Sequence, residues 1–213
     1  MLSEALTFFL AKCQRKFKRL GYLHESIAIE SRFKRCKNAW EGHLEMSHQV
    51  IKDAVERTAH HKKIVILGAG AGHDIPFDYL LKKFDEIHLV DVVFLAGIRK
   101  LAGRHSKIKL IESDVTGAVD TLCSTRDLHD MKQVEITPPQ NIIFGADLVI
   151  SCNLLSQLPV TIRKDLIEKG ETEESVGLTD FCRSIVISHL RWLENCDAAV
   201  LLITDLERHF IPN

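Results

Sequence analysis

Glycine recurs at alternating positions directly after a short apolar run in the middle of this chain. Residues 63–67 read KIVIL and residues 68–72 read GAGAG. Because glycine has no Cβ, such a turn lets a ligand approach the backbone amides. A helix that starts after the turn, from about Pro76, favours polar or anionic ligand groups at its N-terminus. The pattern therefore indicates a ligand site at a strand-to-helix turn.

Acidic residues follow the next two apolar runs. Asp91 lies nineteen residues after Gly72, at the end of the run EIHLVD, where a carboxylate can accept both ribose hydroxyls of a nucleoside. Asp114 follows the run at 108–111, and it can either accept a hydrogen bond from an adenine amine or cap the helix expected at 116–122. A tight connection with a solvated aspartate is the alternative interpretation of the turn and Asp91.

Short apolar runs separated by helical lengths predict an α/β fold, with a parallel sheet buried on both faces and helices on either side. We expect a helical N-terminal cap over residues 1–60 and a Rossmann-like domain over 61–213. The cap should hold helices at 6–20, closed by Gly21, at 26–40 and at 44–55. Loops are expected at 137–139 and at 169–179, the second as a candidate cover for the ligand mouth. The expected strands are Ile64–Leu67, Ile87–Val90, Ile108–Ile111, Leu148–Ser151 and Ala199–Thr204.

Composition excludes several classes of protein. The 213 residues are 46% hydrophobic and 27% charged, which is typical of a globular protein, and the net charge is −1. Six scattered cysteines without a CxxC pair predict neither a disulfide framework nor a metal site, and they favour a reducing, cytoplasmic compartment. No apolar run reaches the ~18 residues of a membrane-spanning helix. Basic residues between Lys12 and Lys37 are interpreted first as a solvated helix face, and an anion, RNA or lipid headgroup is the alternative partner.

Residues 62–205 resemble the class I S-adenosylmethionine-dependent methyltransferase superfamily. The resemblance depends on GAGAG as its first motif, on Asp91, on Ser113-Asp114-Val115 and on the run ADLVISCNLLSQLP at 146–159. It implies a Rossmann-like fold, S-adenosylmethionine as the cofactor and methyl transfer to a small molecule. The cofactor-binding residues that it implies are Gly68, Ala69, Gly70, Gly72, Asp91, Val92, Asp114, Val115 and Asn153.

The chain departs from the superfamily's pattern in two places. Ile66 stands where many members carry an acid, and the expected strands end before the antiparallel hairpin that usually completes the sheet. An uncovered edge strand is prone to association, so a homo-oligomer is one expectation. The alternatives are that the hairpin is lost or that the sequence is truncated.

Methyl transfer needs positioning more than a nucleophile, because the leaving group is already activated. A hydroxyl or amine acceptor would also need a base, for which His73, Asp74 and His189 are candidates. Cys152 is interpreted as a small residue near the cofactor rather than as a nucleophile. The segment 151–154 (SCNL) offers no stacking aromatic, which disfavours a flipped nucleic-acid base as substrate.

Two other functions remain open. An NAD(P)-dependent oxidoreductase would use the same fold, but His73 stands in place of the third glycine of the dehydrogenase fingerprint. A protein that binds a nucleoside or a partner without turnover is the second alternative, because a fold does not imply a function.

Overall fold

The computed structural model describes residues 11–124, 129 and 135–205. Within these ranges a five-stranded sheet has the order β3-β2-β1-β4-β5, with every neighbouring pair parallel. This is the Rossmann-like order expected of a nucleotide-binding α/β fold. The strands are β1 (Lys63–Leu67), β2 (Glu86–Asp91), β3 (Ile108–Glu112), β4 (Leu148–Cys152) and β5 (Ala199–Ile203).

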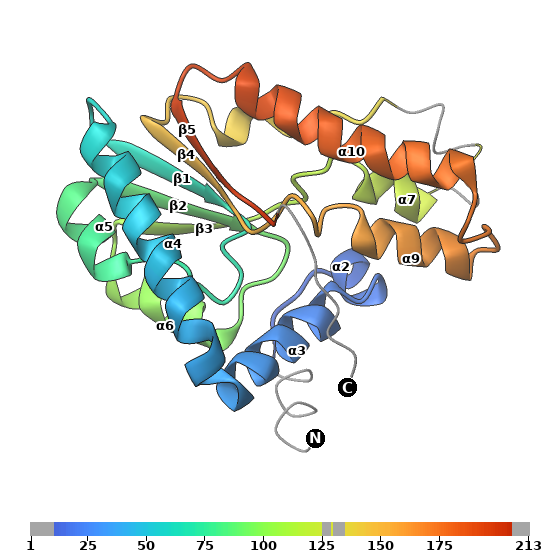
Figure 1. Ribbon diagram of the computed structural model, residues 1–213, viewed down its shortest axis with the longest axis horizontal. Coiled ribbons are helices and arrows are strands. Elements are labelled where there is room, and N and C mark those ends of the chain that lie inside the picture. The colour runs from blue at the N-terminus through green and yellow to red at the C-terminus, as the bar shows by residue number, and fades with distance from the viewer. Residues whose placement is uncertain (1–10, 125–128, 130–134, 206–213) are drawn as a thin grey trace.

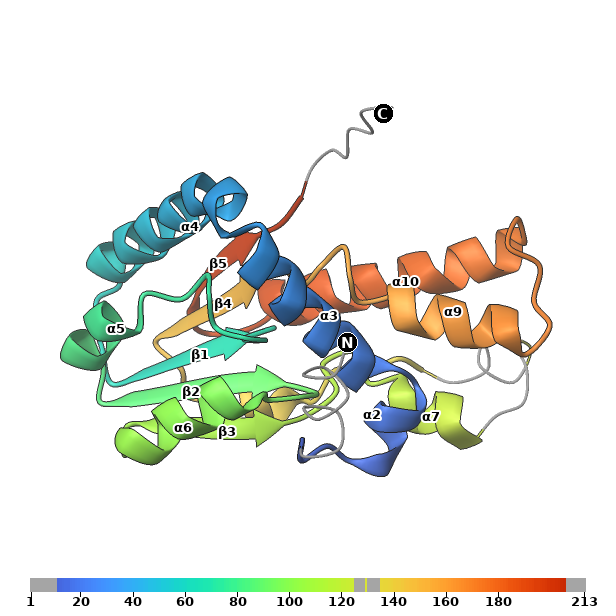
Figure 2. The same ribbon diagram turned by 90° about the horizontal axis from the view of Figure 1, so that it is seen from below.

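Helices cover both faces of the sheet, as Figures 1 and 2 show. They are α2 (Arg15–Arg19), α3 (Tyr22–Arg35), α4 (Lys37–Arg57), α5 (Phe77–Lys83), α6 (Ala96–Arg104), α7 (Val119–Ser124), the short 3-10 helix η1 (Gln140–Ile142), α9 (Val160–Glu168) and α10 (Val176–Glu194). None of the helices in the described ranges has both the length and the apolarity needed to cross a membrane.

Side chains that alternate along each strand divide the core into two layers. Ile64 and Ile66 of β1 pack with α4, α5 and α6, whereas Val65 and Leu67 pack with α7, α9 and α10. All four side chains are completely buried. Burial on both faces explains why β1 appears in the sequence as an uninterrupted apolar run.

Three expectations about the helices need correction. The second expected helix, at 26–40, is divided at Cys36, so that Trp40 belongs to α4; Cys36 leaves the helical conformation (φ −117°, ψ 28°) without a proline or glycine to signal the break. The expected loop at 169–179 ends early, because Ser175 accepts a bond from the Leu178 N–H and starts α10 at Val176. The expected first helix is described only from residue 11, and its observed part is α2, followed by Gly21 at φ +88°.

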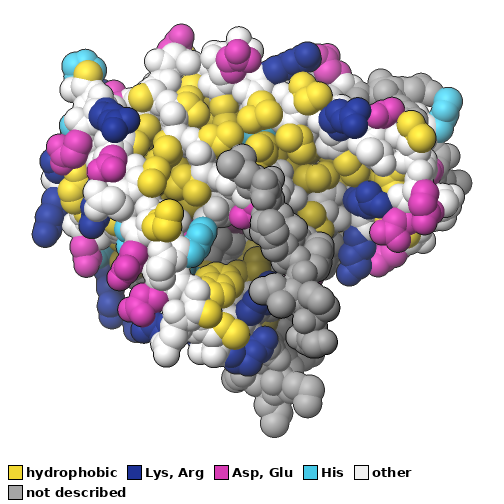
Figure 3. All heavy atoms as spheres, in the orientation of Figure 1, with side chains coloured by type: hydrophobic (Ala, Val, Ile, Leu, Met, Phe, Trp, Pro, Cys, Tyr) yellow, Lys and Arg dark blue, Asp and Glu magenta, His cyan; other side chains and the backbone are white. Residues whose placement is uncertain are grey.

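The sheet is open at β5 within the described ranges, since β5 pairs with β4 alone. Val200 and Leu202 of β5 are 41% and 37% exposed. Figure 3 shows apolar side chains gathered over this strand and between α4 and α10. No antiparallel hairpin follows β5 among the described residues.

Candidate functional site

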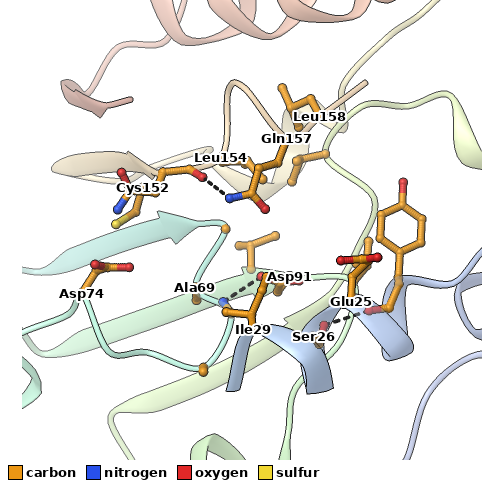
Figure 4. Close-up of a pocket in the computed structure, with 18 of the residues that line it drawn as sticks. Glu25, Ser26, Ile29, Ala69, Asp74, Asp91, Cys152, Leu154, Gln157 and Leu158 are labelled. Carbon is orange, nitrogen blue, oxygen red and sulfur yellow. Dashed lines mark hydrogen bonds between the residues drawn. The ribbon is translucent and has the colours of Figure 1, made fainter. Parts of the chain in front are cut away.

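A cavity of about 240 Å³ lies at the carboxyl ends of the strands, where an open parallel sheet binds ligands. Its walls come from the glycine turn after β1, the ends of β2 and β4, the loop after β3, and helices α3, α4 and α9. We call this space the central cavity; Figure 4 shows many of the side chains around it.

The three glycines of the turn have different surroundings. All three have positive φ, at +74° for Gly68, +47° for Gly70 and +77° for Gly72. A Cβ on Gly68 would lie 2.9 Å from the Leu154 Cβ, and one on Gly72 would lie 2.5 Å from the Ile98 Cδ1. A Cβ on Gly70 would meet no atom closer than 3.9 Å. Gly68 and Gly72 therefore allow close packing of the turn, whereas Gly70 leaves open space.

Asp91 at the end of β2 faces this turn. Its Oδ2 accepts a hydrogen bond of 2.7 Å from the Gly70 N–H, and its Oδ1 accepts one of 3.3 Å from the Val93 N–H. Burial raises the pKa of Asp91, although these backbone donors oppose the rise. Asp91 lines the cavity beside the open space at Gly70.

The other residues expected around the cofactor also line the central cavity. Ala69, Val92 and Val115 contribute apolar walls, and Asp114 contributes a carboxylate. The carboxylate of Asp114 accepts bonds from the Thr116 N–H at 2.8 Å and the Val119 N–H at 2.9 Å. Asp114 therefore caps the start of α7, which was one of its two expected roles.

Asn153 lines the cavity just after β4 in a conformation unusual for a residue with a side chain. Its φ of +49° is the one positive value at a non-glycine residue in the described part of the chain. Asparagine tolerates this left-handed conformation better than most residues. Its N–H donates to the Ile203 O at 2.9 Å, and its O accepts from the Gln157 side chain at 3.0 Å.

The N-terminal helices, which the sequence predicts as a cap, form one wall of the cavity, but the sequence did not indicate which of their residues line it. Tyr22, Glu25, Ser26 and Ile29 of α3 line the cavity, as does Trp40 of α4. In Figure 4 the labelled α3 residues face Leu154 and Gln157 across the space. Ser26, Ile29 and Trp40 lie within the helix expected at 26–40, whereas Tyr22 and Glu25 lie before it, because α3 begins at Tyr22. No local signal in the sequence shows which surface a helix covers.

His73 holds this helical cover to the glycine turn. Its Nε2 lies 2.7 Å from the Glu30 Oε2, and its ring stacks on Phe33 with centroids 3.6 Å apart. Although burial raises the pKa of Glu30, the hydrogen bonds from His73 and Lys34 outweigh it and hold this pKa below its usual value. The ring that was a candidate base is thus engaged in fastening α3.

Two other candidates for chemistry are not available for it. His189 does not line the central cavity; it is completely buried and lies 3.0 Å from the Ser151 Oγ, and burial lowers its pKa to about 4. Its candidacy as a base at the cavity mouth is therefore wrong. Burial and the nearby charge of Asp74 raise the pKa of Cys152 to about 12, so its thiol stays neutral at physiological pH.

Asp74 remains as the titratable candidate that faces the cavity, and it lies beside a residue that the sequence did not single out for chemistry. Its Oδ1 is 3.1 Å from the Nε2 of His43 on α4. The Nδ2 of Asn153 lies 3.3 Å from the same ring nitrogen. In the described ranges no three His, Cys, Asp or Glu side chains converge as a metal site.

Comparison with known proteins adds little to this description. No family model matches the chain, and no curated protein matches it. Among solved structures it is similar to a short-chain dehydrogenase/reductase SDR from Burkholderia vietnamiensis, at 13% identity over 71% of this chain and 85% of that chain, with a TM-score of 0.29. A similarity at this level says nothing about the cofactor, and the fold assignment depends on the sheet order itself.

Proposed function

We propose that the central cavity binds S-adenosylmethionine and that the protein is a methyltransferase acting on a small molecule. The observation that carries the proposal is the pairing of Asp91 with the open corner at Gly70. A part-buried carboxylate that lines the cavity beside unfilled space is suited to the two hydroxyls of an adenosine ribose.

The charge of the cavity favours a cationic ligand. Among the described residues that line it, four carry carboxylates and none is a lysine or arginine. S-adenosylmethionine bears a sulfonium, an ammonium and one carboxylate, which makes it a net cation, whereas the pyrophosphate of a nicotinamide dinucleotide makes that cofactor a net anion. The four acidic residues are Glu25, Asp74, Asp91 and Asp114.

The size of the cavity points the same way. Small-molecule sites usually measure about 300 to 1,000 Å³. At about 240 Å³ the central cavity suits a single nucleoside better than a dinucleotide. Apolar walls from Val92, Val115 and Leu158 suit the faces of an adenine ring.

When bound, S-adenosylmethionine supplies an activated methyl group, so the protein's task is to position the reactants and exclude water. The α3 side chains Tyr22, Ser26 and Ile29 cover the cavity and limit access of solvent. A wall of α3 side chains over the cavity favours a small acceptor over a macromolecule.

A thermal unfolding screen tests the proposal. S-adenosylmethionine and S-adenosylhomocysteine should each raise the melting temperature of the protein as their concentration rises, because both bind the folded state. NAD, NADH, NADP and NADPH should leave it unchanged. Stabilisation by a nicotinamide dinucleotide alone would indicate an oxidoreductase, and stabilisation by none of these ligands would contradict a nucleoside site.

A further inference from the structure

The carboxylate of Asp74 lies at the end of the central cavity formed by Cys152 and the glycine turn. Figure 4 shows Asp74 on the same side of the cavity as Cys152, across the space from the residues of α3. Asp91 lies between this end and Glu25 in the same view. Of the four carboxylates that line the cavity, Asp74 is therefore the one at the end away from Glu25.

Asp74 is poorly satisfied by the protein itself. Its Oδ1 is shielded from solvent and accepts no hydrogen bond from the described residues. His43 Nε2 is 3.1 Å away, which is ion-pair distance without the geometry of a hydrogen bond. That nitrogen also lies 3.3 Å from the Asn153 amide nitrogen, and it cannot accept from an amide and donate to a carboxylate at once. A shielded carboxylate oxygen without a donor is costly unless a further donor completes it.

The surroundings indicate which donor is missing. Among the described residues, no lysine or arginine lies within ion-pair distance of Asp74, and none lines the cavity. Many members of the superfamily that the sequence resembles carry an acid at the position of Ile66. Here that side chain is completely buried and apolar, so it supplies no carboxylate for the ligand. A cationic hydrogen-bond donor on the ligand would pair with Asp74 without competition from a lysine or arginine of the described residues, and His43 is the one basic side chain beside it.

We propose that Asp74 is the binding residue for a primary ammonium group of the ligand. This inference rests on the proposed function, under which the ammonium is that of the amino-acid part of S-adenosylmethionine. Asp91 and the Gly70 corner would hold the nucleoside, and Asp74 would hold the opposite end of the same molecule.

Two ligands that differ in the amino-acid part separate these roles. S-adenosylhomocysteine carries the ammonium, whereas 5′-methylthioadenosine keeps the nucleoside and sulfur but lacks it. Isothermal titration of wild type and Asp74→Asn with both compounds measures the contribution of the contact. The substitution should weaken S-adenosylhomocysteine about 10- to 100-fold, as expected for a charge-assisted hydrogen bond, and leave the affinity for 5′-methylthioadenosine unchanged.

Asp78→Asn is the matched control, because it removes the same charge from an exposed position on α5 outside the cavity. It should change neither affinity, and the melting temperature of each unliganded variant reports whether it folds. Unchanged binding of S-adenosylhomocysteine by Asp74→Asn, or an equal loss for both ligands, would overturn the role of Asp74 while leaving the proposed function intact. If wild type bound neither compound, the proposed function would fail, and the assignment of Asp74 with it.

Discussion

Gly70 and Gly72 are two residues apart, and the absence of a side chain has a different structural role at each. At Gly72 the requirement comes from packing, since the Phe77 Cε2 would lie 2.8 Å and the Ile98 Cδ1 2.5 Å from a Cβ. At Gly70 the space is open and belongs to the cavity. One glycine shapes the turn, and the other leaves room for a ligand.

Alanine substitutions should separate stability from binding at these two positions. Gly70→Ala should cost about 1 to 2 kcal/mol of unfolding free energy from its positive φ, and it should strongly weaken S-adenosylhomocysteine by placing a methyl group in the cavity. Gly72→Ala should cost about 2 to 5 kcal/mol, because overpacking adds to the conformational strain. Urea denaturation and calorimetric titration of both variants measure the two effects. A larger stability loss at Gly70 than at Gly72 would contradict this division of roles.

The charged form of Asp91 destabilises the unliganded fold, because the carboxylate is removed from water. Burial raises its pKa above the ordinary value of 3.8, so the unliganded fold holds this proton more tightly than the unfolded chain does. The contribution of Asp91 to stability therefore falls as the pH rises from about 3.8 through the raised pKa. A charge that is unfavourable for folding suggests a role in binding.

Asp91→Asn should consequently be more stable than wild type at neutral pH. Asparagine keeps an oxygen that can accept from the Gly70 N–H and carries no charge to desolvate; it gives up the longer bond of 3.3 Å from the Val93 N–H, because an amide NH2 cannot accept. The advantage should disappear in acid, where the wild-type carboxyl is also neutral. Thermal unfolding of the two unliganded proteins across this pH range measures the difference; a variant less stable than wild type at neutral pH would show that the carboxylate stabilises the fold instead.

At the scale of elements, helix α3 lies over the carboxyl ends of the strands and forms one wall of the central cavity. It is fastened to the glycine turn by Glu30 and Phe33, both of which contact His73. Leu23 and Ile27 of α3 also pack with Val93 and Leu95 in a buried apolar cluster, so the helix is held by apolar burial as well as by the polar and stacked contacts with His73. Substitution of Glu30 or Phe33 should therefore loosen the contact between α3 and the glycine turn without unfolding the sheet.

Glu30→Gln tests this fastening through its pH dependence. The pKa of Glu30 is held below its usual value of 4.5, so the stabilisation that it provides is complete above this pH and is lost as the pH falls through the lowered pKa. The variant should be less stable than wild type at neutral pH, should bind S-adenosylhomocysteine less tightly, and should match the stability of wild type in acid. Urea denaturation at neutral and acid pH measures the difference in unfolding free energy between the variant and wild type.

Lys34→Met provides the control for Glu30→Gln. Lys34 lies 3.1 Å from Glu30, but its side chain is 71% exposed, so its loss should have little effect. An equal effect of the two substitutions would mean that surface charge, rather than contact with His73, explains the role of Glu30.

At the scale of the whole molecule, the sequence predicts the sheet well and the cover poorly. Each strand begins and ends within one residue of its expected position, because strands buried on both faces appear as apolar runs. The turn and Asp91 were found for the same reason, since they follow such runs directly. The five parallel strands and their helices confirm the Rossmann-like α/β expectation.

The contacts of the cover depend on residues distant in sequence. His43 and Asp74 are 31 positions apart, and Glu30 and His73 are 43 apart. Neither pair forms a motif, and helical periodicity indicates only that one face of α3 or α4 is buried. The break at Cys36, which sets the direction of α4, has no glycine or proline to mark it. These contacts between residues distant in sequence could therefore be identified only from the three-dimensional structure.

Calorimetric titration of S-adenosylhomocysteine into wild type and Asp91→Asn tests the central claim most directly. Asp91→Asn is expected to fold at least as well as wild type, so lost binding cannot be attributed to unfolding. Wild type should bind with a stoichiometry of one, and the variant should bind at least about 10-fold more weakly, because it loses the charged acceptor for the ribose hydroxyls. Equal affinity of the two proteins would contradict a nucleoside site at the Gly70 corner.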